Sequence, residues 1–312
     1  MPADASGTAT ETYLPRIGVV IVNWNRGVDT VRCIASVLAS DYPCFELVLV
    51  DNGSTDRSAD VIQQVYPELP ILRNLRNLGF TGGYNTGIRE VLRRGVDYVF
   101  LLNNDAVLEP SALTLLAKAA MAHPTAGFLG PVICTLEDRR TILSAGGTLL
   151  RGWKPCHRAI GEVDKGQFDT VTEVDYLSGC ALLVSRKAID TVGLLDEDYF
   201  AYHEDIDWCY RGKQAGFKVL VVPQAKIWHP DTRRRDENSP LVTYYVARNS
   251  LLFAKKHRFG AIVLLRMFFQ YLRVLTSWTV RPRWRYKRRQ RDALARALLH
   301  FMLGRAGEMG PL

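Results

Sequence analysis

The chain has 312 residues, 47% of them apolar and 23% charged, with a formal net charge of +8. This length allows one large domain or two smaller ones, and the apolar fraction excludes a disordered chain. Residues 1–14 have neither a basic segment nor an apolar run, which predicts a disordered tail and not a signal peptide. The six cysteines show no CxxC or zinc spacing, so we expect reduced packing thiols and a cytoplasmic protein.

The first 135 residues alternate short apolar runs with helical patterns. Apolar, β-branched runs predict strands at 17–23, 45–50, 69–72, 98–102 and 127–133. Apolar residues at helical spacing predict helices at 29–39, 59–65, 88–92 and 111–121. This alternation is typical of βαβ units, so we expect an α/β fold with a mostly parallel central sheet and helices on both faces.

Beyond residue 140 the pattern loosens. Segments 141–151 and 171–184 predict strands of an antiparallel extension, because glycines punctuate them. A helix is expected at 208–215, followed by Gly216 as its terminating residue and by a strand at 218–222.

Three early strands end in Asn or Asp, at segments 23–25, 51–54 and 103–105. Turn preference explains any one of these segments, but three on one edge of a parallel sheet favour a ligand site. Asp105 is suited to hold Mg²⁺ or Mn²⁺, ions that take oxygen ligands and share them with substrate phosphates. Asp51 is better placed for a hydrogen bond to a nucleobase or ribose.

The glycine-rich segment 77–85 is neither a Rossmann fingerprint nor a P-loop. Its glycines permit close approach of backbone to a ligand, and the helix that follows can direct its N-terminus at phosphate.

Three acids lie close together downstream, at Glu204, Asp205 and Asp207. They either complement a helix N-terminus or include a general base whose pKa its acidic neighbours raise. His229, in the sequence Ile-Trp-His-Pro, is either structural or a nitrogen ligand for the metal.

Taken in order, seven motifs over residues 15–255 resemble family 2 glycosyltransferases of the GT-A fold, in particular the bacterial rhamnosyltransferase-like enzymes of cell-envelope polysaccharide synthesis. The motifs are VVIVNWN, LVLVDNGSTD, NLGFTGGYNTG, FLLNNDAVL, SGCALLVSR, LLDEDYFAYHEDIDWCYRGKQAGF and IWHP. The resemblance implies a nucleotide-sugar-binding half at 15–135 and an acceptor-binding half at 136–255. It also implies inverting transfer of rhamnose or another hexose from a dTDP- or UDP-linked donor to a hydroxyl of a lipid-linked glycan.

The resemblance further assigns the site residues. Asp205 would be the catalytic base with Glu204 and Asp207 as supporting acids, and Asp105 and His229 would hold Mg²⁺ or Mn²⁺. The donor would be bound by Asn23, Asn25, Asp51, Asn77, Gly79, Asn85, Asn103 and Asn104. Asn103 departs from the family pattern, because it replaces the first acid of the DxD metal motif.

The positive charge is concentrated near the C-terminus. Without the seven Lys and Arg residues at 281–291 the net charge falls from +8 to +1, which disfavours a nucleic-acid surface over the core. Segment 260–278 is apolar, but Arg266 and Arg273 would each cost about 2.5–3.5 kcal/mol at a bilayer centre. We therefore expect residues 256–312 to form an amphipathic and polybasic helical region that binds an anionic membrane surface through 260–291.

Other interpretations remain open for the helix and for the enzyme class. The helix could instead pack on the catalytic domain, and a nucleic-acid tail is a weaker alternative. A sugar nucleotidyltransferase would show a lysine-containing loop after the first strand, where this chain has Asn-Trp-Asn-Arg at 23–26. An inactive membrane-docked scaffold is disfavoured by the presence of Asp105, Asp205 and His229.

Overall fold

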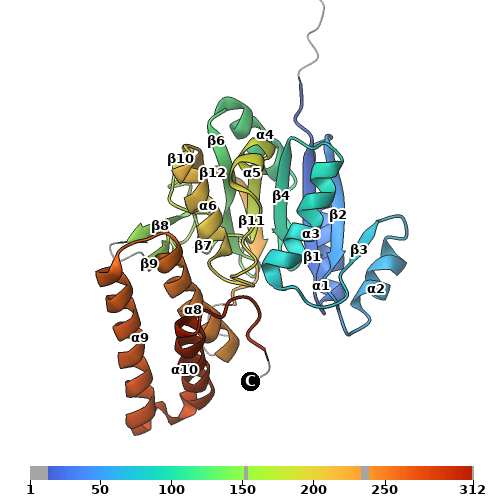
Figure 1. The fold of residues 1–312 in the computed structure, drawn as a ribbon. Coiled ribbons are helices and arrows are strands. Elements are labelled where there is room, and N and C mark those ends of the chain that lie inside the picture. The colour runs from blue at the N-terminus through green and yellow to red at the C-terminus, as the bar shows by residue number, and fades with distance from the viewer. Residues whose placement is uncertain (1–12, 151–153, 233–238, 311–312) are drawn as a thin grey trace, which may run out of the picture.

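The computed structural model describes residues 13–150, 154–232 and 239–310. Its centre is a ten-stranded sheet in the order β10-β12-β6-β11-β4-β1-β2-β3, with β5 paired to β12 and β7 to β6 (Figure 1). The predicted tail falls outside the described residues, apart from Tyr13 and Leu14. All six cysteines are free, and four of them are buried.

The N-terminal half follows the predicted alternation. Its elements are β1 Ile17–Asn23, α1 Gly27–Leu38, β2 Phe45–Asp51, α2 Ser58–Val65, β3 Ile71–Arg73, α3 Gly79–Arg93 and β4 Tyr98–Asn103. The four strands are parallel, and their register pairs Asn23 with Asp51 and Val22 with Asn103. The polar residues that end these strands therefore meet at one edge of the sheet.

The glycines of segment 77–85 lie inside helix α3 and not in a loop before it. A Cβ on Gly87 would stand 2.3 Å from Val20 Cγ1, and one on Gly83 would stand 2.8 Å from Val22 Cγ1. These glycines therefore allow α3 to pack closely on β1. The predicted helix at 88–92 is the second half of this longer helix.

The second half of the sheet contains the predicted antiparallel extension. Its elements are β5 Val107–Leu108, α4 Ala112–Ala122, β6 Ala126–Thr135, β7 Ile142–Ser144, β8 Gly147–Leu150, β9 Lys154–His157, β10 Thr172–Glu173, β11 Ala181–Ser185, α5 Arg186–Val192, α6 Glu204–Gln214 and β12 Lys218–His229. Strand β11 is antiparallel to both β4 and β6, and β12 runs parallel to β6. Because β12 extends seven residues beyond the predicted strand, His229 is its last residue, at the edge that carries the other polar strand ends.

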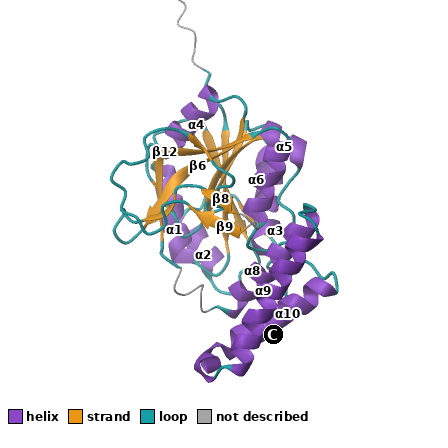
Figure 2. Cartoon of the chain, turned by 90° about the vertical axis from the view of Figure 1, so that its left-hand side faces the viewer, coloured by secondary structure: helices purple, strands orange, loops and turns teal. Residues whose placement is uncertain are grey.

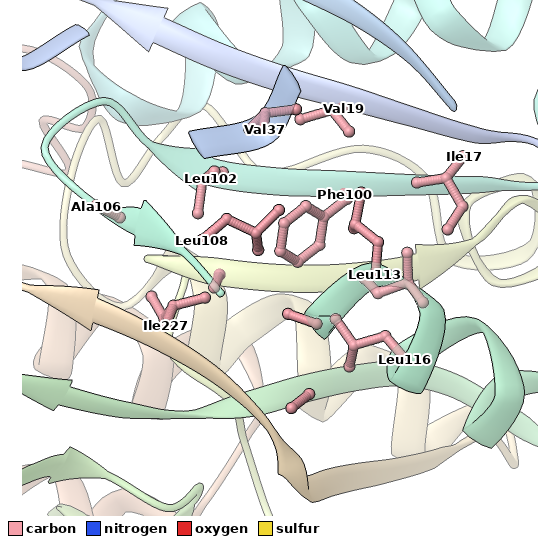
Figure 3. Close-up of a cluster of buried hydrophobic side chains, with 14 of the residues drawn as sticks. Ile17, Val19, Val37, Phe100, Leu102, Ala106, Leu108, Leu113, Leu116 and Ile227 are labelled. Atoms are coloured by element: carbon pink, nitrogen blue, oxygen red, sulfur yellow. The ribbon is translucent and has the colours of Figure 1, made fainter. Parts of the chain in front are cut away.

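The core lies on both faces of the sheet, as the continuous apolar strands predict. On one face, Phe100 and Leu102 pack with Ile17 and with α4 through Leu113 (Figure 3). On the other face, alternate strand residues such as Val20 pack against α3 and α6.

A C-terminal helical unit follows, formed by α8 Pro240–Lys256, α9 Ala261–Val280, the 3₁₀ helix η1 Pro282–Lys287 and α10 Arg288–Met302. It lies beyond the edge of the sheet where the parallel strands end (Figures 1 and 2). Leu294 and Leu298 of α10 are buried with Tyr244, Tyr245 and Leu251 of α8. The predicted boundary between residues 255 and 256 therefore divides a packed unit, because α8 belongs with the helices that follow it.

Helix α9 confirms the predicted helix but contains no buried residue. One face, including Met267 and Tyr271, packs on the core of the helical unit, whereas Ile262, Leu265 and Phe269 are exposed. Within the described part of the chain, no helix combines the length and apolar character needed to cross a membrane.

Candidate active site

Asn23 lies at the centre of a hydrogen-bond network at the ends of β1 and β2. It is fully buried, and its Nδ2 donates to Asp51 Oδ1 at 3.1 Å, Ser54 Oγ at 3.1 Å and Ser58 Oγ at 2.9 Å. Asn25 Oδ1 accepts from the backbone N–H of Thr55 at 2.8 Å. Both asparagines therefore shape the segment after β2, and Asn23 holds the Asp51 carboxylate in place.

Asn77 and Asn85, both predicted to bind the nucleotide sugar, make different contacts at and within helix α3. Asn77 Oδ1 accepts from the backbone N–H of Gly79 at 2.8 Å and from Asn52 Nδ2 at 3.0 Å, at the start of the helix. Asn85 is buried, and its side chain bonds to both the backbone N–H and the C=O of Leu195. The structure therefore does not direct Asn85 at a ligand, because it ties α3 to the segment before α6. Asn52 directly follows Asp51 and bonds to Asn77, but sequence reasoning gave it no role at this site.

Asp105 and His229 come together although 124 positions separate them. His229 Nε2 lies 3.0 Å from Asp105 Oδ1, a buried atom that accepts no hydrogen bond from the described residues. His229 Nδ1 lies 2.8 Å from the carbonyl oxygen of Pro230, so Nδ1 carries the proton. In the neutral imidazole, the Nε2 lone pair therefore faces a carboxylate oxygen, an arrangement that a cation between the two atoms would stabilise.

The pKa values of the pair agree with this electrostatic picture. Burial alone would lower the pKa of His229, but Cys180 and the Asp105 carboxylate raise it to about 11. Burial alone would raise the pKa of Asp105. Its contact with His229 and the charge of the Arg26 guanidinium, 3.4 Å away, outweigh burial and lower that pKa. The site thus attracts positive charge, whether a proton or a metal ion.

The two side chains fit a divalent ion that also binds the donor. Two neighbouring ligands of an octahedral ion, each about 2.1 Å from it, lie about 3 Å from each other. Asp105 Oδ1 and His229 Nε2 are 3.0 Å apart, which matches this spacing. Among the described residues, no third His, Cys, Asp or Glu completes a metal cluster with them. Such an ion would take its other ligands from the donor diphosphate and water.

Asn103 and Asn104 flank this pair. Asn103 Nδ2 lies 3.4 Å from His229 Nε2, so Asn103 stands beside the metal pair but offers an amide and not a carboxylate. Asn104 Nδ2 donates to Thr30 Oγ1 at 2.9 Å, which fixes the turn after β4.

A cavity of about 550 Å³ brings the metal pair and the predicted base together. Asn103 and His229 line one part of it, and Glu204 and Asp205, at the start of α6, line another. The Asp205 carboxylate accepts from the backbone N–H of Gly179 at 2.9 Å and of Ile206 at 2.8 Å. These bonds aim the carboxylate while leaving it beside the cavity.

Burial raises the pKa of Asp205 although the two backbone N–H groups oppose this effect. Burial, and then the charge of Asp205, raise the pKa of Glu204 well above its usual range. Glu204 Oε2 is buried and has no hydrogen-bond partner among the described residues. Burial thus raises the pKa of both acids, and Asp205 is the one whose carboxylate two backbone N–H groups hold beside the cavity.

Asp207 does not reach the cavity, because two helical residues turn the side chain by about 200° from Asp205. It is fully buried and contacts Arg211 at 2.7 Å, Lys256 at 2.8 Å and His257 at 2.7 Å. Burial alone would raise its pKa, but the hydrogen bond with His257 and the charges of Arg211 and Lys256 hold it below the usual range. Asp207 thus joins α6 to the end of α8, and the prediction of a supporting acid is replaced by a structural role.

The segment before Asp205 adopts an unusual backbone conformation. Phe200, Tyr202 and His203 have φ values of 63°, 67° and 75°, which non-glycine residues rarely adopt. Such strain persists only where the surroundings fix it, and it concentrates at functional sites.

Two buried residues of α8, which sequence reasoning missed, fix this segment. Asn249 Nδ2 donates to the carbonyl oxygens of Tyr199 at 3.0 Å, Ala201 at 2.8 Å and Tyr202 at 2.7 Å. Arg248 Nη2 donates to the carbonyl oxygens of Asp198 and Tyr199, each at 3.0 Å. The signal in the sequence is an Arg-Asn pair between the apolar segments YYVA and LLFA of the helix.

The chain end completes the same arrangement. Arg248 Nη1 donates to the carbonyl oxygen of Gly307 at 2.5 Å, and the Gly307 N–H donates to the Asp198 carbonyl oxygen at 2.7 Å. We call Arg248, Asn249 and Gly307 the loop clamp.

Replacing Asn249 with alanine is expected to lower the free energy of unfolding by about 2–4 kcal/mol, because buried carbonyls lose their donor. The amides of residues 198–203 should exchange faster, and kcat should fall more than donor affinity. Urea denaturation, hydrogen exchange and steady-state kinetics measure these effects. Lys255→Ala, an exposed change on the same helix, is the control, and unchanged exchange in Asn249→Ala would contradict the clamp.

The sheet order and the polar strand ends that face the start of α6 are those of a GT-A nucleotide-sugar transferase fold. A mannosyltransferase from Pyrobaculum calidifontis, solved in complex with GDP-Man and Mn²⁺, superposes with a TM-score of 0.59 at 15% identity, covering 94% of this chain and 88% of that one. This likeness confirms the predicted fold.

The chain belongs to glycosyltransferase family 2, since the profile described as Glycosyl transferase family 2 matches residues 18–193. It is 32% identical over 251 residues to an N-acetylglucosaminyl-diphospho-decaprenol L-rhamnosyltransferase of Mycobacterium tuberculosis, covering 73% of this chain and 80% of the relative. It is 24% identical over 258 residues to a dTDP-rhamnosyl transferase of Shigella flexneri, covering 80% and 83%. The protein is thus a rhamnosyltransferase-like glycosyltransferase, as the motifs predict.

Proposed function

We propose that this glycosyltransferase inverts the anomeric centre of a sugar, rhamnose or another hexose, as it moves it from a dTDP- or UDP-linked donor to a hydroxyl of a lipid-linked glycan. The observation that carries the proposal is the single cavity lined by His229, the partner of Asp105, and by Asp205. The relatives whose names specify a dTDP-rhamnosyl group and a diphospho-decaprenol support the donor and acceptor classes.

The geometry suggests a direct displacement. Asp205 removes the proton from the acceptor hydroxyl, whose oxygen bonds to the anomeric carbon as the bond from that carbon to the diphosphate oxygen breaks on the opposite face. Asp105 and His229 would hold Mg²⁺ or Mn²⁺, which would offset the negative charge developing on the departing diphosphate. Asn103 and Arg26 stand beside this ion pair and would orient the diphosphate.

The first experiment is a panel of nucleotide sugars, each tested with Mg²⁺ and with Mn²⁺ for thermal stabilisation of the protein. The donor that stabilises it is then incubated with a lipid-linked acceptor, and the anomeric configuration of the product is determined by NMR. Retention of configuration would contradict the displacement. Failure of every donor to bind would favour the inactive scaffold, and release of diphosphate from a sugar phosphate and a nucleoside triphosphate would favour a nucleotidyltransferase.

We also propose that α9 and the basic residues after it contact an anionic membrane surface from the cytoplasmic side. Ile262, Leu265 and Phe269 are 68%, 54% and 56% exposed and form one stripe of the helix. Arg266 and Arg273 border this stripe. The opposite face of α9 packs on the helical unit, so the helix would lie flat with its exposed stripe toward the lipid.

Replacing Arg281, Arg283 and Arg285 with glutamine is expected to weaken binding to anionic vesicles about a hundredfold, since each basic side chain contributes about 1 kcal/mol at such a surface. Vesicle sedimentation at two salt concentrations measures this. The control neutralises three exposed cations of the sheet domain, Arg93, Lys118 and Lys187. Equal binding by both variants would refute the proposal. Deleting 256–312 is less informative, because it removes the α10 residues that cover α8.

A further inference from the structure

A second cavity, of about 240 Å³, lies between β9, α8 and α9. Pro155, His203 and Val246 line both this cavity and the larger one that contains Asp205. The two cavities are therefore adjacent, and we call the wall that they share, which contains His203, the neck.

The His203 side chain is the polar group at that neck. The residue is 7% exposed and lines both cavities. Burial lowers the pKa of His203 to about 4, so the imidazole is neutral and offers one donor and one acceptor. A polar ligand in either cavity can therefore bond to this ring.

The second cavity has a different character from the first. Val246 and Met267 give it apolar walls, and the hydroxyls of Ser250 and Tyr271 bond to each other at 2.9 Å. Lys154 is the charged residue of its lining. The cavity is therefore apolar inside, with one cation at its edge.

The second cavity also leads to the exposed side of α9. Gln270 lines both this cavity and a groove that contains Arg266 and Arg273. We call this series of adjacent hollows the path. It starts at Asp205, passes His203 at the neck and the second cavity, which we call the apolar chamber, and ends at the face of α9 that bears apolar and basic residues.

We propose that this path is the binding track of the acceptor, a glycan carried on a long apolar chain through an anionic phosphate link. The sugar lies in the larger cavity with its hydroxyl at Asp205, and His203 hydrogen-bonds to the polar groups of that sugar. The phosphate link lies beside Lys154, and the first carbons of the chain lie against Val246 and Met267. This inference rests on the proposed function and assigns a subsite to its acceptor.

The test compares two acceptors that carry the same sugar and diphosphate, one on a long polyprenyl chain and one on a short alkyl chain. Met267→Trp fills the apolar chamber and should raise KM for the long-chain acceptor about tenfold while leaving the short-chain KM unchanged. Leu299→Trp, an exposed change on α10 outside the stripe and in neither cavity, is the control. Lys154→Gln, an exposed change with little effect on folding, should raise KM for both acceptors.

His203→Phe keeps a ring at the neck but removes the donor and the acceptor that the imidazole would offer to the sugar. It should raise KM for both acceptors about three- to tenfold and be partly rescued by His203→Gln.

Equal effects of Met267→Trp on the two acceptors, or unchanged KM values in both His203→Phe and Lys154→Gln, would overturn the track while leaving the proposed function intact. Failure of the wild-type protein to use either acceptor would instead contradict the proposed function.

Discussion

Replacing Asp205 with asparagine is expected to lower kcat about a thousandfold while leaving the Kd of the nucleotide sugar within about twofold, since general bases contribute about 10²–10⁴-fold. Asparagine has the same shape and its amide oxygen can accept the bond that Gly179 donates to the carboxylate. The variant should therefore fold and bind the donor normally. Single-turnover kinetics and calorimetry separate these two quantities.

The pH dependence provides a second readout of the same residue. A base acts only when deprotonated, so kcat/KM should decline as the pH falls through the raised pKa of Asp205, above the usual range of an aspartate. Glu204 and His157 are the titratable neighbours that act on it. The acidic limb should disappear in Asp205→Asn and persist in Asp198→Asn, an exposed acid nearby. A wild-type limb that survives in Asp205→Asn would assign the base elsewhere.

Replacing Asp105 with alanine is expected to abolish metal-dependent transfer, a loss of about a thousandfold or more, because the ion loses its carboxylate ligand. His229 would remain as a single protein ligand, held by its bond to Pro230. Calorimetric titration of Mn²⁺ in the presence of the nucleoside diphosphate should show that the ion no longer binds. Activity measured across a range of Mn²⁺ concentrations checks the same loss.

Asn103→Ala is the comparison for this prediction. Its amide stands beside His229 but contributes no charge, so the change should weaken donor binding only a few fold. Near-normal turnover in Asp105→Ala, or equal losses in the two variants, would show that the metal is held elsewhere.

The sequence predicts much of the fold because local patterns determine it. Apolar runs predict the four parallel strands, and the Asn or Asp that ends three of them predicts the edge where their polar ends meet. The glycines of α3 were assigned to a ligand loop, since their use in packing against Val20 and Val22 depends on a strand far away in sequence. Tertiary contacts of this kind leave no periodic signal.

The candidate site likewise contains residues whose position the sequence predicts and residues whose position it does not. Strand-end chemistry and motif resemblance point to Asp105, His229 and Asp205, and the structure places His229, the partner of Asp105, on the same cavity as Asp205. Asn85 and Asp207 are also polar residues of these motifs, but each lies on a helix face that is turned into the protein. The orientation of a polar side chain depends on packing, which a single sequence does not display.

The loop clamp also joins parts of the chain that are far apart in sequence. Asp198, at the start of the strained segment, bonds to Gly307, near the other end of the chain. During synthesis the N-terminal strands and α6 leave the ribosome well before α8 and the last residues. A chain cut between α6 and α8 would therefore keep the residues proposed to bind the donor, yet it would lack the contacts that hold residues 198–203. The clamp thus couples the geometry around Asp205 to the packing of α8 and of the segment at Gly307.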